Sequence, residues 1–142
     1  MKLSTRTRYG MRAMIELAHE GKRPLQLKAI ADRQDISVKY LEQLMSLLRS
    51  AGFVRSVRGS KGGYILARPA GEVKLSEIFR CLEGPVSTTE CTEDEDCCKR
   101  STDCAARELW MEVEAAIQGV LNSMTLADMV KKAKAHSSEY QI

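Results

Sequence analysis

Four cysteines stand within fourteen residues, and their thiols are the side chains best suited here to bind a metal or sense redox state: Cys91, Cys97, Cys98 and Cys104. The first residues show no apolar stretch behind their charges, so we expect no secretion signal and a reducing, cytoplasmic location. Stable disulfides are not expected there. Thiols placed this densely therefore predict a metal-binding or redox-sensing segment.

The spacing of these cysteines favours one kind of metal site. Five residues separate Cys91 from Cys97, and five separate Cys98 from Cys104. Zinc sites use pairs of cysteines about two to four residues apart, and no such spacing occurs here. Iron–sulfur clusters accept longer intervals because their irons are spread over a larger cage. We expect a 2Fe-2S or 4Fe-4S cluster; a cluster-free thiol switch, a zinc site and a purely structural loop are the alternatives.

Three of the five cysteines need separate comment. Cys97 and Cys98 are neighbours, and adjacent side chains of an extended segment point to opposite sides. Binding of both to one iron would need a sharply bent backbone, so the choice between them is open. Cys81 lies three residues after Ile78 on an expected helix, and we interpret it as a small core residue.

Charge divides the chain into two halves. Residues 1–68 hold fourteen Lys or Arg against five Asp or Glu, a balance of +9, whereas residues 69–142 hold eight against fourteen, a balance of −6. This asymmetry indicates a polyanion-binding half and a separate regulatory or association half. A basic but merely solvated face is the alternative. The apolar fraction of 44% is ordinary for a soluble globular protein and allows a real core.

The elements that would position these groups can be read from apolar spacing. Helical periodicity predicts a helix from Ser4 to Ala18, a short one from Leu25 and a third between Ser37 and Ala51, with Ser4 and Ser37 as N-caps. Residues 53–58 alternate as a strand, residues 59–63 form a glycine-rich turn and residues 64–66 return. Three helices followed by a hairpin is the order of a winged helix-turn-helix.

The second half predicts more helix around the cysteines. We expect a helix over 75–82, a loop over 86–103, a long helix of about 20 residues beginning between Asp103 and Arg107, a last helix capped by Thr125 and Asp128, and frayed residues at 136–142. The long helix carries an apolar stripe from Leu109 to Met124 that the winged helix cannot cover, which predicts a homodimer. A charge at Leu121 should then separate the subunits.

These elements give a mainly α fold with a small β-hairpin in three parts. Residues 1–84 would be the winged helix-turn-helix domain, residues 85–104 the cysteine loop, and residues 105–142 the dimerisation helix and tail. No apolar run is long enough for a membrane span.

The third helix and the hairpin tip predict DNA contacts. The N-terminal part of a recognition helix reaches base edges in the major groove. Gln43 can pair with adenine and Glu42 can accept from cytosine, while Ser37 and Tyr40 can donate to phosphates. The basic, glycine-rich tip can approach the sugar-phosphate chain closely. The candidate DNA-binding residues are Ser37, Lys39, Tyr40, Glu42, Gln43, Arg58, Gly59, Ser60, Lys61 and Gly62.

These motifs resemble a known family. The segments Tyr40-Leu41-Glu42-Gln43-Leu44 and Gly52-Phe53-Val54, with the later Gly62-Gly63-Tyr64, are similar to those of the IscR/NsrR/CymR-type bacterial regulators, the Rrf-two family. Cys104 followed by Leu109-Trp110 is similar to the iron–sulfur cluster branch in particular. The resemblance implies a homodimeric winged-helix transcription factor whose long C-terminal helices cross between subunits, and a cysteine loop that holds the cluster.

The chain departs from that branch at two positions. The branch has three cysteines at five-residue intervals and a histidine three residues after the last one. Here an extra cysteine is present, and Arg107, which cannot be a ligand, stands at the histidine position. The fourth ligand is open: the second of the paired cysteines, a carboxylate such as Glu108, or a group from the partner chain.

We therefore expect a sequence-specific transcription regulator that binds double-stranded DNA at a palindromic operator and acts on no small-molecule substrate. An enzyme or electron carrier is disfavoured because no phosphate loop or nucleotide fingerprint occurs, and Gly59 to Gly63 lie in a hairpin. An adaptor controlled by a protein partner is the third possibility, and the cysteine loop argues against it.

Overall fold

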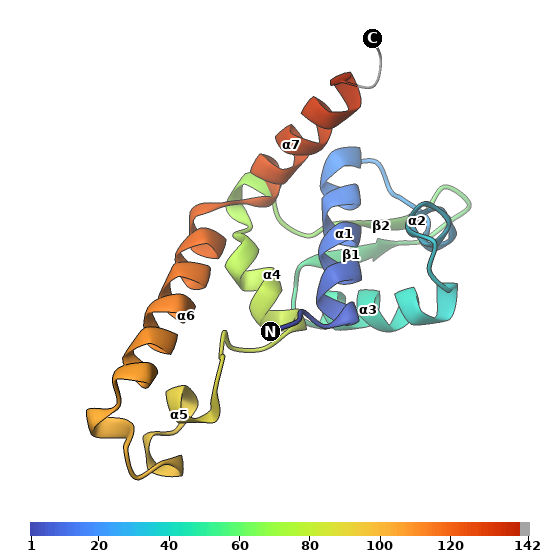
Figure 1. Ribbon diagram of the computed structural model, residues 1–142. Coiled ribbons are helices and arrows are strands. Elements are labelled where there is room, and N and C mark those ends of the chain that lie inside the picture. The colour runs from blue at the N-terminus through green and yellow to red at the C-terminus, as the bar shows by residue number, and fades with distance from the viewer. Residues whose placement is uncertain (140–142) are drawn as a thin grey trace.

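The computed structural model describes residues 1–139 of the chain (Figure 1). Its first three helices are α1 (Thr5–Glu20), α2 (Leu27–Gln34) and α3 (Val38–Ser50). Both expected N-caps are confirmed. The Ser4 hydroxyl accepts from the Thr7 amide at 3.1 Å, and the Ser37 hydroxyl accepts from the Tyr40 amide at 3.1 Å. Each hydroxyl thus satisfies a backbone donor that the first turn of its helix leaves unpaired.

The wing is an antiparallel pair of strands, β1 (Val54–Val57) and β2 (Gly63–Leu66). Leu25 adds a third short pairing, because its backbone exchanges hydrogen bonds of 3.0 and 2.9 Å with Tyr64. The turn needs glycine at position 62, where a Cβ would lie 2.1 Å from the Val57 carbonyl oxygen. The mainly α fold with a small hairpin is therefore confirmed, with strands slightly displaced from the expected bounds.

A single hydrophobic core joins α1 and α3 to α4 (Leu75–Leu82) and reaches α7 (Leu126–Glu139) through the fully buried Leu126. Helices α1 and α4 approach closely at Gly10, where a Cβ would meet Leu82 Cδ1 at 2.6 Å. Cys81 packs against this core but stays half-buried, and burial raises the pKa of its thiol.

The long helix α6 (Ala105–Ser123) begins inside the expected window. Its end is pinned to the domain by backbone pairing: the Leu75 amide donates to the Met124 carbonyl, and the Leu126 amide to the Val73 carbonyl, both at 3.0 Å. The expected Thr125 cap is confirmed, because the Asp128 carboxylate accepts from the Thr125 amide at 2.9 Å. The expectation of fraying was wrong for residues 136–139, which continue α7, and residues 140–142 lie outside the described residues.

The expected loop over 86–103 contains more local structure than its polarity predicted. It holds α5 (Glu90–Glu93) and two 3-10 turns, η2 (Glu95–Cys97) and η3 (Ser101–Asp103), besides the earlier turn η1 (Ala70–Glu72). Side chains make these turns by bonding to nearby backbone; the Asp94 carboxylate, for example, accepts from the Asp96 amide at 2.9 Å. No helix among the described residues is long and apolar enough to cross a membrane.

Candidate nucleic-acid interface and cysteine loop

The candidate recognition helix α3 separates its polar and apolar side chains. Lys39, Glu42 and Gln43 are exposed at helical spacing, while Leu41 and Leu44 on the opposite face are buried in the core. The structure therefore brings these three candidates onto one free face. The N-terminal end of α3 and the hairpin tip both lie on the side of the domain away from α6 (Figure 1).

Tyr40 is held from the side by α1. Its half-buried ring packs edge-to-face against Tyr9, and the guanidinium carbons of Arg8 and Arg12 lie 5.9 and 5.5 Å from the Tyr9 ring centroid. Both arginines are exposed, so they add positive charge beside the recognition helix. The sequence predicted the helix that carries these residues but did not assign Arg8, Tyr9 or Arg12 to the candidate DNA-binding face. Arginines one turn apart, with an aromatic residue between them, were the available signal.

The wing tip presents four of its five candidates to solvent: Arg58, Gly59, Ser60 and Lys61. Gly62 differs, because it is buried and its amide donates to the Gly59 carbonyl at 3.0 Å. Its role in the structure is to close the turn. Gln26, just before α2, donates to the Ser60 carbonyl at 3.5 Å and helps to hold the tip in place.

The four loop cysteines do not converge in this conformation. Cys91 and Cys104 are half-buried, whereas Cys97 and Cys98 are exposed. Among the described residues, no group of three or more His, Cys, Asp or Glu side chains is placed to hold a metal ion. Cys91 Sγ lies 3.1 Å from the Thr89 hydroxyl. Partial desolvation, and then the charges of Cys91 and nearby carboxylates, raise the pKa of Cys97, which favours its neutral thiol.

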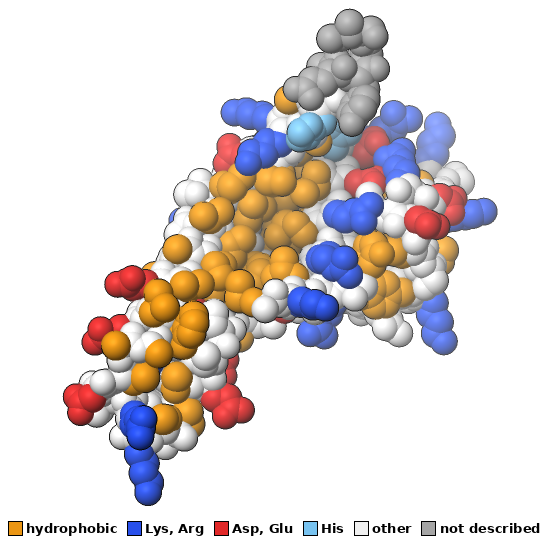
Figure 2. Space-filling view, in the orientation of Figure 1, with side chains coloured by type: hydrophobic (Ala, Val, Ile, Leu, Met, Phe, Trp, Pro, Cys, Tyr) orange, Lys and Arg blue, Asp and Glu red, His pale blue; other side chains and the backbone are white. Residues whose placement is uncertain are grey.

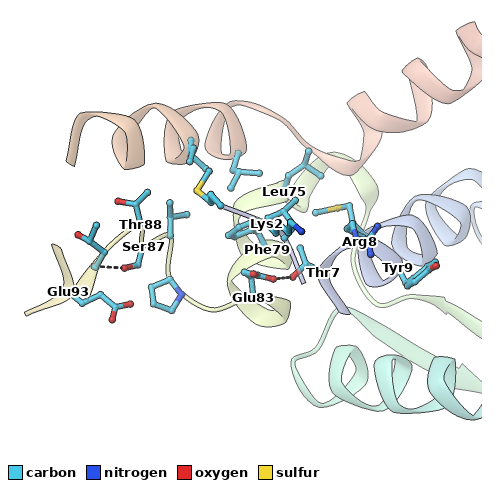
Figure 3. Close-up of a pocket in the computed structure, with 18 of the residues that line it drawn as sticks. Lys2, Thr7, Arg8, Tyr9, Leu75, Phe79, Glu83, Ser87, Thr88 and Glu93 are labelled. Atoms are coloured by element: carbon cyan, nitrogen blue, oxygen red, sulfur yellow. Dashed lines mark hydrogen bonds between the residues drawn. The ribbon is translucent and has the colours of Figure 1, made fainter. Parts of the chain in front are cut away.

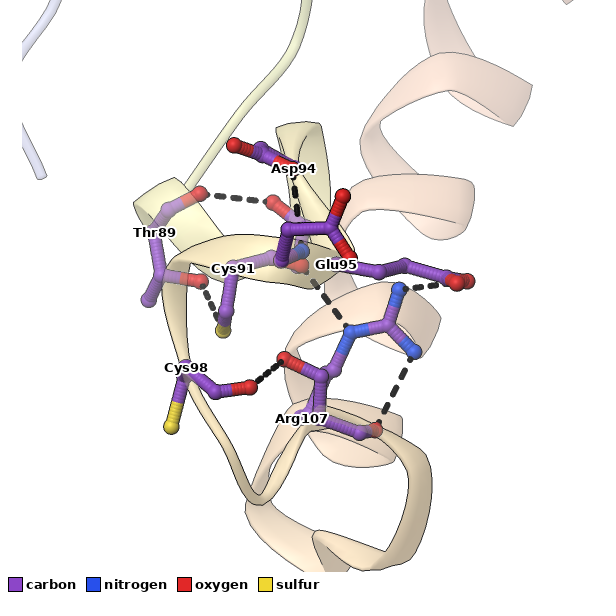
Figure 4. Close-up of polar contacts among 9 residues, drawn as sticks. Thr89, Cys91, Asp94, Glu95, Cys98 and Arg107 are labelled. Carbon is purple, nitrogen blue, oxygen red and sulfur yellow. Dashed lines mark hydrogen bonds and ion pairs between the residues drawn. The ribbon is translucent and has the colours of Figure 1, made fainter.

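Two charged residues of α6 fasten the cysteine loop (residues 85–104) to that helix. The Arg107 guanidinium donates to the Cys91 carbonyl at 3.0 Å and also contacts Glu95 and the Ser101 carbonyl (Figure 4). Glu114 accepts from the Thr88 amide at 2.6 Å, the Thr88 hydroxyl at 2.9 Å and the Thr92 hydroxyl at 2.7 Å. The loop is thus ordered by the chain's own polar contacts.

A groove of about 1120 Å³ lies between α1, α4, α6 and the start of the cysteine loop (Figure 3). Its apolar wall includes Leu3, Met11, Leu75, Phe79, Ile117 and Leu121. Hydrophobic side chains line this hollow and continue along α6 (Figure 2). At its edge the Glu83 carboxylate accepts from the Ser4 hydroxyl at 2.5 Å and from the Thr7 hydroxyl, and these bonds hold the pKa of Glu83 below its usual value.

Helix α6 itself has no buried residue. Four of its large apolar side chains are well exposed: Leu109 at 50%, Trp110 at 38%, Met111 at 45% and Val120 at 59%. Ile117 and Leu121 face the groove instead, and Leu121 also packs against the core.

Comparison with known proteins identifies the family. Residues 3–132 match the model of the Rrf2 family, described as an iron-dependent transcriptional regulator. The chain belongs to the Rrf2 family. It is 42% identical to protein rrf2 of Nitratidesulfovibrio vulgaris over 94% of this chain and 89% of that one. The solved structure of CymR, the global cysteine regulator of Bacillus subtilis, has a TM-score of 0.80 at 43% identity and covers 93% of this chain and 98% of its own.

An IscR structure is similar to the same degree. IscR of T. potens has a TM-score of 0.79 at 41% identity and covers 100% of this chain and 92% of that one. Rrf2 members are transcriptional regulators, so this chain is a transcription regulator and not an enzyme, as the sequence predicted. The chain is therefore similar to both the CymR and the IscR regulators. Thiolates are the donors that an iron–sulfur cluster needs, so the loop fits by chemistry, although the described arrangement does not gather the ligands.

Proposed function

We propose that this Rrf2 regulator is a homodimer that reads a palindromic operator with α3 and the wing, and that its cysteine loop binds an iron–sulfur cluster controlling its DNA affinity or choice of site. The observation that carries the DNA-reading part is the free face of Lys39, Glu42 and Gln43 on a helix whose other face is buried. A side chain that faces solvent from a firmly packed helix can enter the major groove without unfolding anything.

The proposed dimer contact is the exposed stripe of α6. Large contiguous apolar surfaces on small soluble proteins mark association sites, and α6 leaves Leu109, Trp110 and Val120 largely exposed among the described residues. A second copy is the occupant we infer, because an isologous contact gives the two-fold symmetry that a palindromic operator requires. The groove beside α1 offers further apolar area to the same contact.

The proposed cluster ligands are Cys91, Cys104 and at least one of Cys97 and Cys98. Four thiols in one segment are the support for this proposal. The bound cluster would supply a signal-sensitive iron centre, and the protein's part is to present thiolates and exclude competing ligands. A cluster-free regulator controlled by thiol oxidation or by a protein partner is the second candidate, and likeness to CymR favours it.

Anaerobic absorption spectroscopy of the reconstituted protein tests the cluster. A visible thiolate-to-iron band is expected for the wild type and should be lost in Cys104→Ala. The matched control is Cys81→Ala, which removes a half-buried thiol outside the loop and should retain the band.

Operator affinity should then be measured for cluster-loaded, cluster-free and Cys104→Ala protein. A sensor predicts a difference of about 1–3 kcal/mol between loaded and free protein, since a ligand shifts an equilibrium only by its differential affinity. Equal affinities for every operator in all three states would leave a DNA-binding regulator without a cluster sensor. A missing band, with affinity that changes on thiol oxidation, would favour the second candidate.

A further inference from the structure

The guanidinium of Arg107, a residue of α6, lies at the centre of the contacts that hold the cysteine loop. The side chain of Arg107 is only 13% exposed, although arginine normally extends into solvent. Its donors reach the Cys91 carbonyl in α5, the Glu95 carboxylate in η2 and the Ser101 carbonyl in η3 (Figure 4). The three acceptors therefore belong to three separate short elements of the loop.

Such a set of contacts fixes the three elements relative to one another. The guanidinium is a rigid planar fork with five N–H donors, so its acceptors must keep a defined spacing to be bound together. The Ser101 end is itself held, because Ser101 is buried and its hydroxyl donates to the Cys98 carbonyl at 2.9 Å. Glu114, seven residues after Arg107 and on the same side of α6, binds Thr88 and Thr92 at the start of the loop.

The arrangement that these contacts hold is one in which the thiols do not converge. Cys91 and Cys104 are half-buried while Cys97 and Cys98 point to solvent, and no three-ligand group occurs among residues 1–139. Convergence requires α5, η2 and η3 to move relative to one another. Such a movement would work against the three contacts of Arg107, which join these elements in their present spacing.

We propose that Arg107 is the positioning residue that locks the cysteine loop closed in its thiol form and opposes the gathering of the thiols around a metal. Closure by Arg107 and metal binding are then linked equilibria, and weakening one favours the other. The first effect, in which Arg107 holds the loop in place, does not depend on the proposed cluster. The second effect, in which Arg107 opposes metal binding, rests on that proposed function.

Two variants and a control isolate this effect. Arg107→Gln removes the charge and most of the fork, and Arg107→Lys keeps the charge but loses the planar fork. Arg100→Gln removes a neighbouring positive charge from an exposed side chain that makes no hydrogen bond or ion pair among the described residues. Circular dichroism and operator binding establish that each variant is folded.

The first measurement is amide hydrogen exchange of the reduced, metal-free protein over residues 88–104. Exchange should accelerate about tenfold in Arg107→Gln and Arg107→Lys, the factor expected for losing one hydrogen bond to a charged group. Arg100→Gln should match the wild type. Unchanged exchange in both Arg107 variants would overturn the proposal that Arg107 holds the loop, whatever the result of the cobalt titration.

The second measurement is an anaerobic cobalt(II) titration followed by the thiolate-to-cobalt absorption band. Both Arg107 variants should bind cobalt more tightly than the wild type and Arg100→Gln, again by about tenfold. Equal or weaker binding would overturn the opposition. No binding by any of the proteins would overturn both the opposition and the proposed metal site, while the exchange result would still decide the lock.

Discussion

The ring of Tyr9 in α1 meets the ring of Tyr40 in α3 edge to face, with centroids 6.3 Å apart and planes at 87°. Edge-to-face aromatic pairs are favourable beyond their buried area, because the positive ring edge meets the negative face. The contact joins the recognition helix to the helix that carries Arg8 and Arg12. In the proposed DNA complex, this contact would set the orientation of Tyr40 before α3 meets the operator.

Loss of this contact should weaken operator binding without unfolding the protein. Tyr9→Leu removes an aromatic pair that contributes about 0.5–1.5 kcal/mol, and operator binding should weaken by at most that amount. Tyr9→Phe keeps the ring and should bind like the wild type. Fluorescence anisotropy with a labelled operator measures both, and equal binding by all three proteins would show that Tyr9 does not position Tyr40.

Gln43→Ala should relax base preference at one position in each half-site. A bidentate contact to a base contributes about 1–3 kcal/mol of discrimination, which the variant loses while its binding to other positions persists. Affinities for a series of single-base operator variants provide the measurement. Ser46→Ala, an exposed change further along α3, is the control. An unaltered base preference in Gln43→Ala would show that another face of α3 enters the groove.

Arg58→Ala and Lys61→Ala should weaken binding to all sequences alike. Their charges at the wing tip would contact phosphates, so each loss releases fewer counterions and flattens the dependence of affinity on salt by about one unit of slope. Lys132→Ala in α7, on the other side of α1 from the wing, is the charge-matched control (Figure 1). A loss confined to one operator sequence would contradict this role.

A charge on the exposed stripe should dissociate the proposed dimer. Leu121, which the sequence favoured for this test, also packs against the core of its own chain, so a charge there would destabilise the fold as well. Val120→Asp and Leu109→Asp avoid this problem because both side chains are at least half exposed. Sedimentation should show monomers for both, and a dimer for Gln118→Glu. A persistent dimer in both Asp variants would mean that α6 is not the contact.

The hydrogen bonds from Ser4 and Thr7 to Glu83 predict that the contact between α1 and the end of α4 weakens in acid. Hydrogen bonds from Ser4 and Thr7 lower the pKa of Glu83 from its ordinary 4.5. The folded state therefore binds this proton less readily than the unfolded state, so the stabilisation is complete above pH 4.5 and is lost as pH falls through the lowered value. Denaturant unfolding of wild type and Glu83→Gln should differ near neutral pH and converge in acid. A gap that is constant over this range would contradict the assignment.

Much of the fold could be predicted because its determinants are local. Helical apolar spacing, the hydroxyls of Ser4 and Ser37 and the close turn at Gly62 act within a few residues of where they stand. The cysteine loop lacked such a signal, since its short turns depend on individual side chain–backbone bonds with no period.

The candidate sites show the same difference between local and long-range determinants. Exposed α3 residues follow from helix periodicity, whereas the contact of Tyr9 with Tyr40 joins distant positions and depends on how α1 crosses α3. Arg107 could be excluded as a ligand from its chemistry. Its contacts with three loop elements could not be predicted, because they require the loop to fold back onto α6.

The backbone pairing of residues 73–75 with 124–126 fixes the C-terminal end of α6 to the domain, while the cysteine loop contacts its N-terminal end. A helix of 19 residues is about 28 Å long. A displacement of about 3 Å at its loop end therefore corresponds to a rotation of the helix by about 6° about its fixed end. Leu126, next to this fixed end, belongs to the same hydrophobic core as the buried side chains of α3. In the proposed dimer, rotation at this point would tilt the two candidate DNA-binding domains against each other and leave the packing inside each domain unchanged.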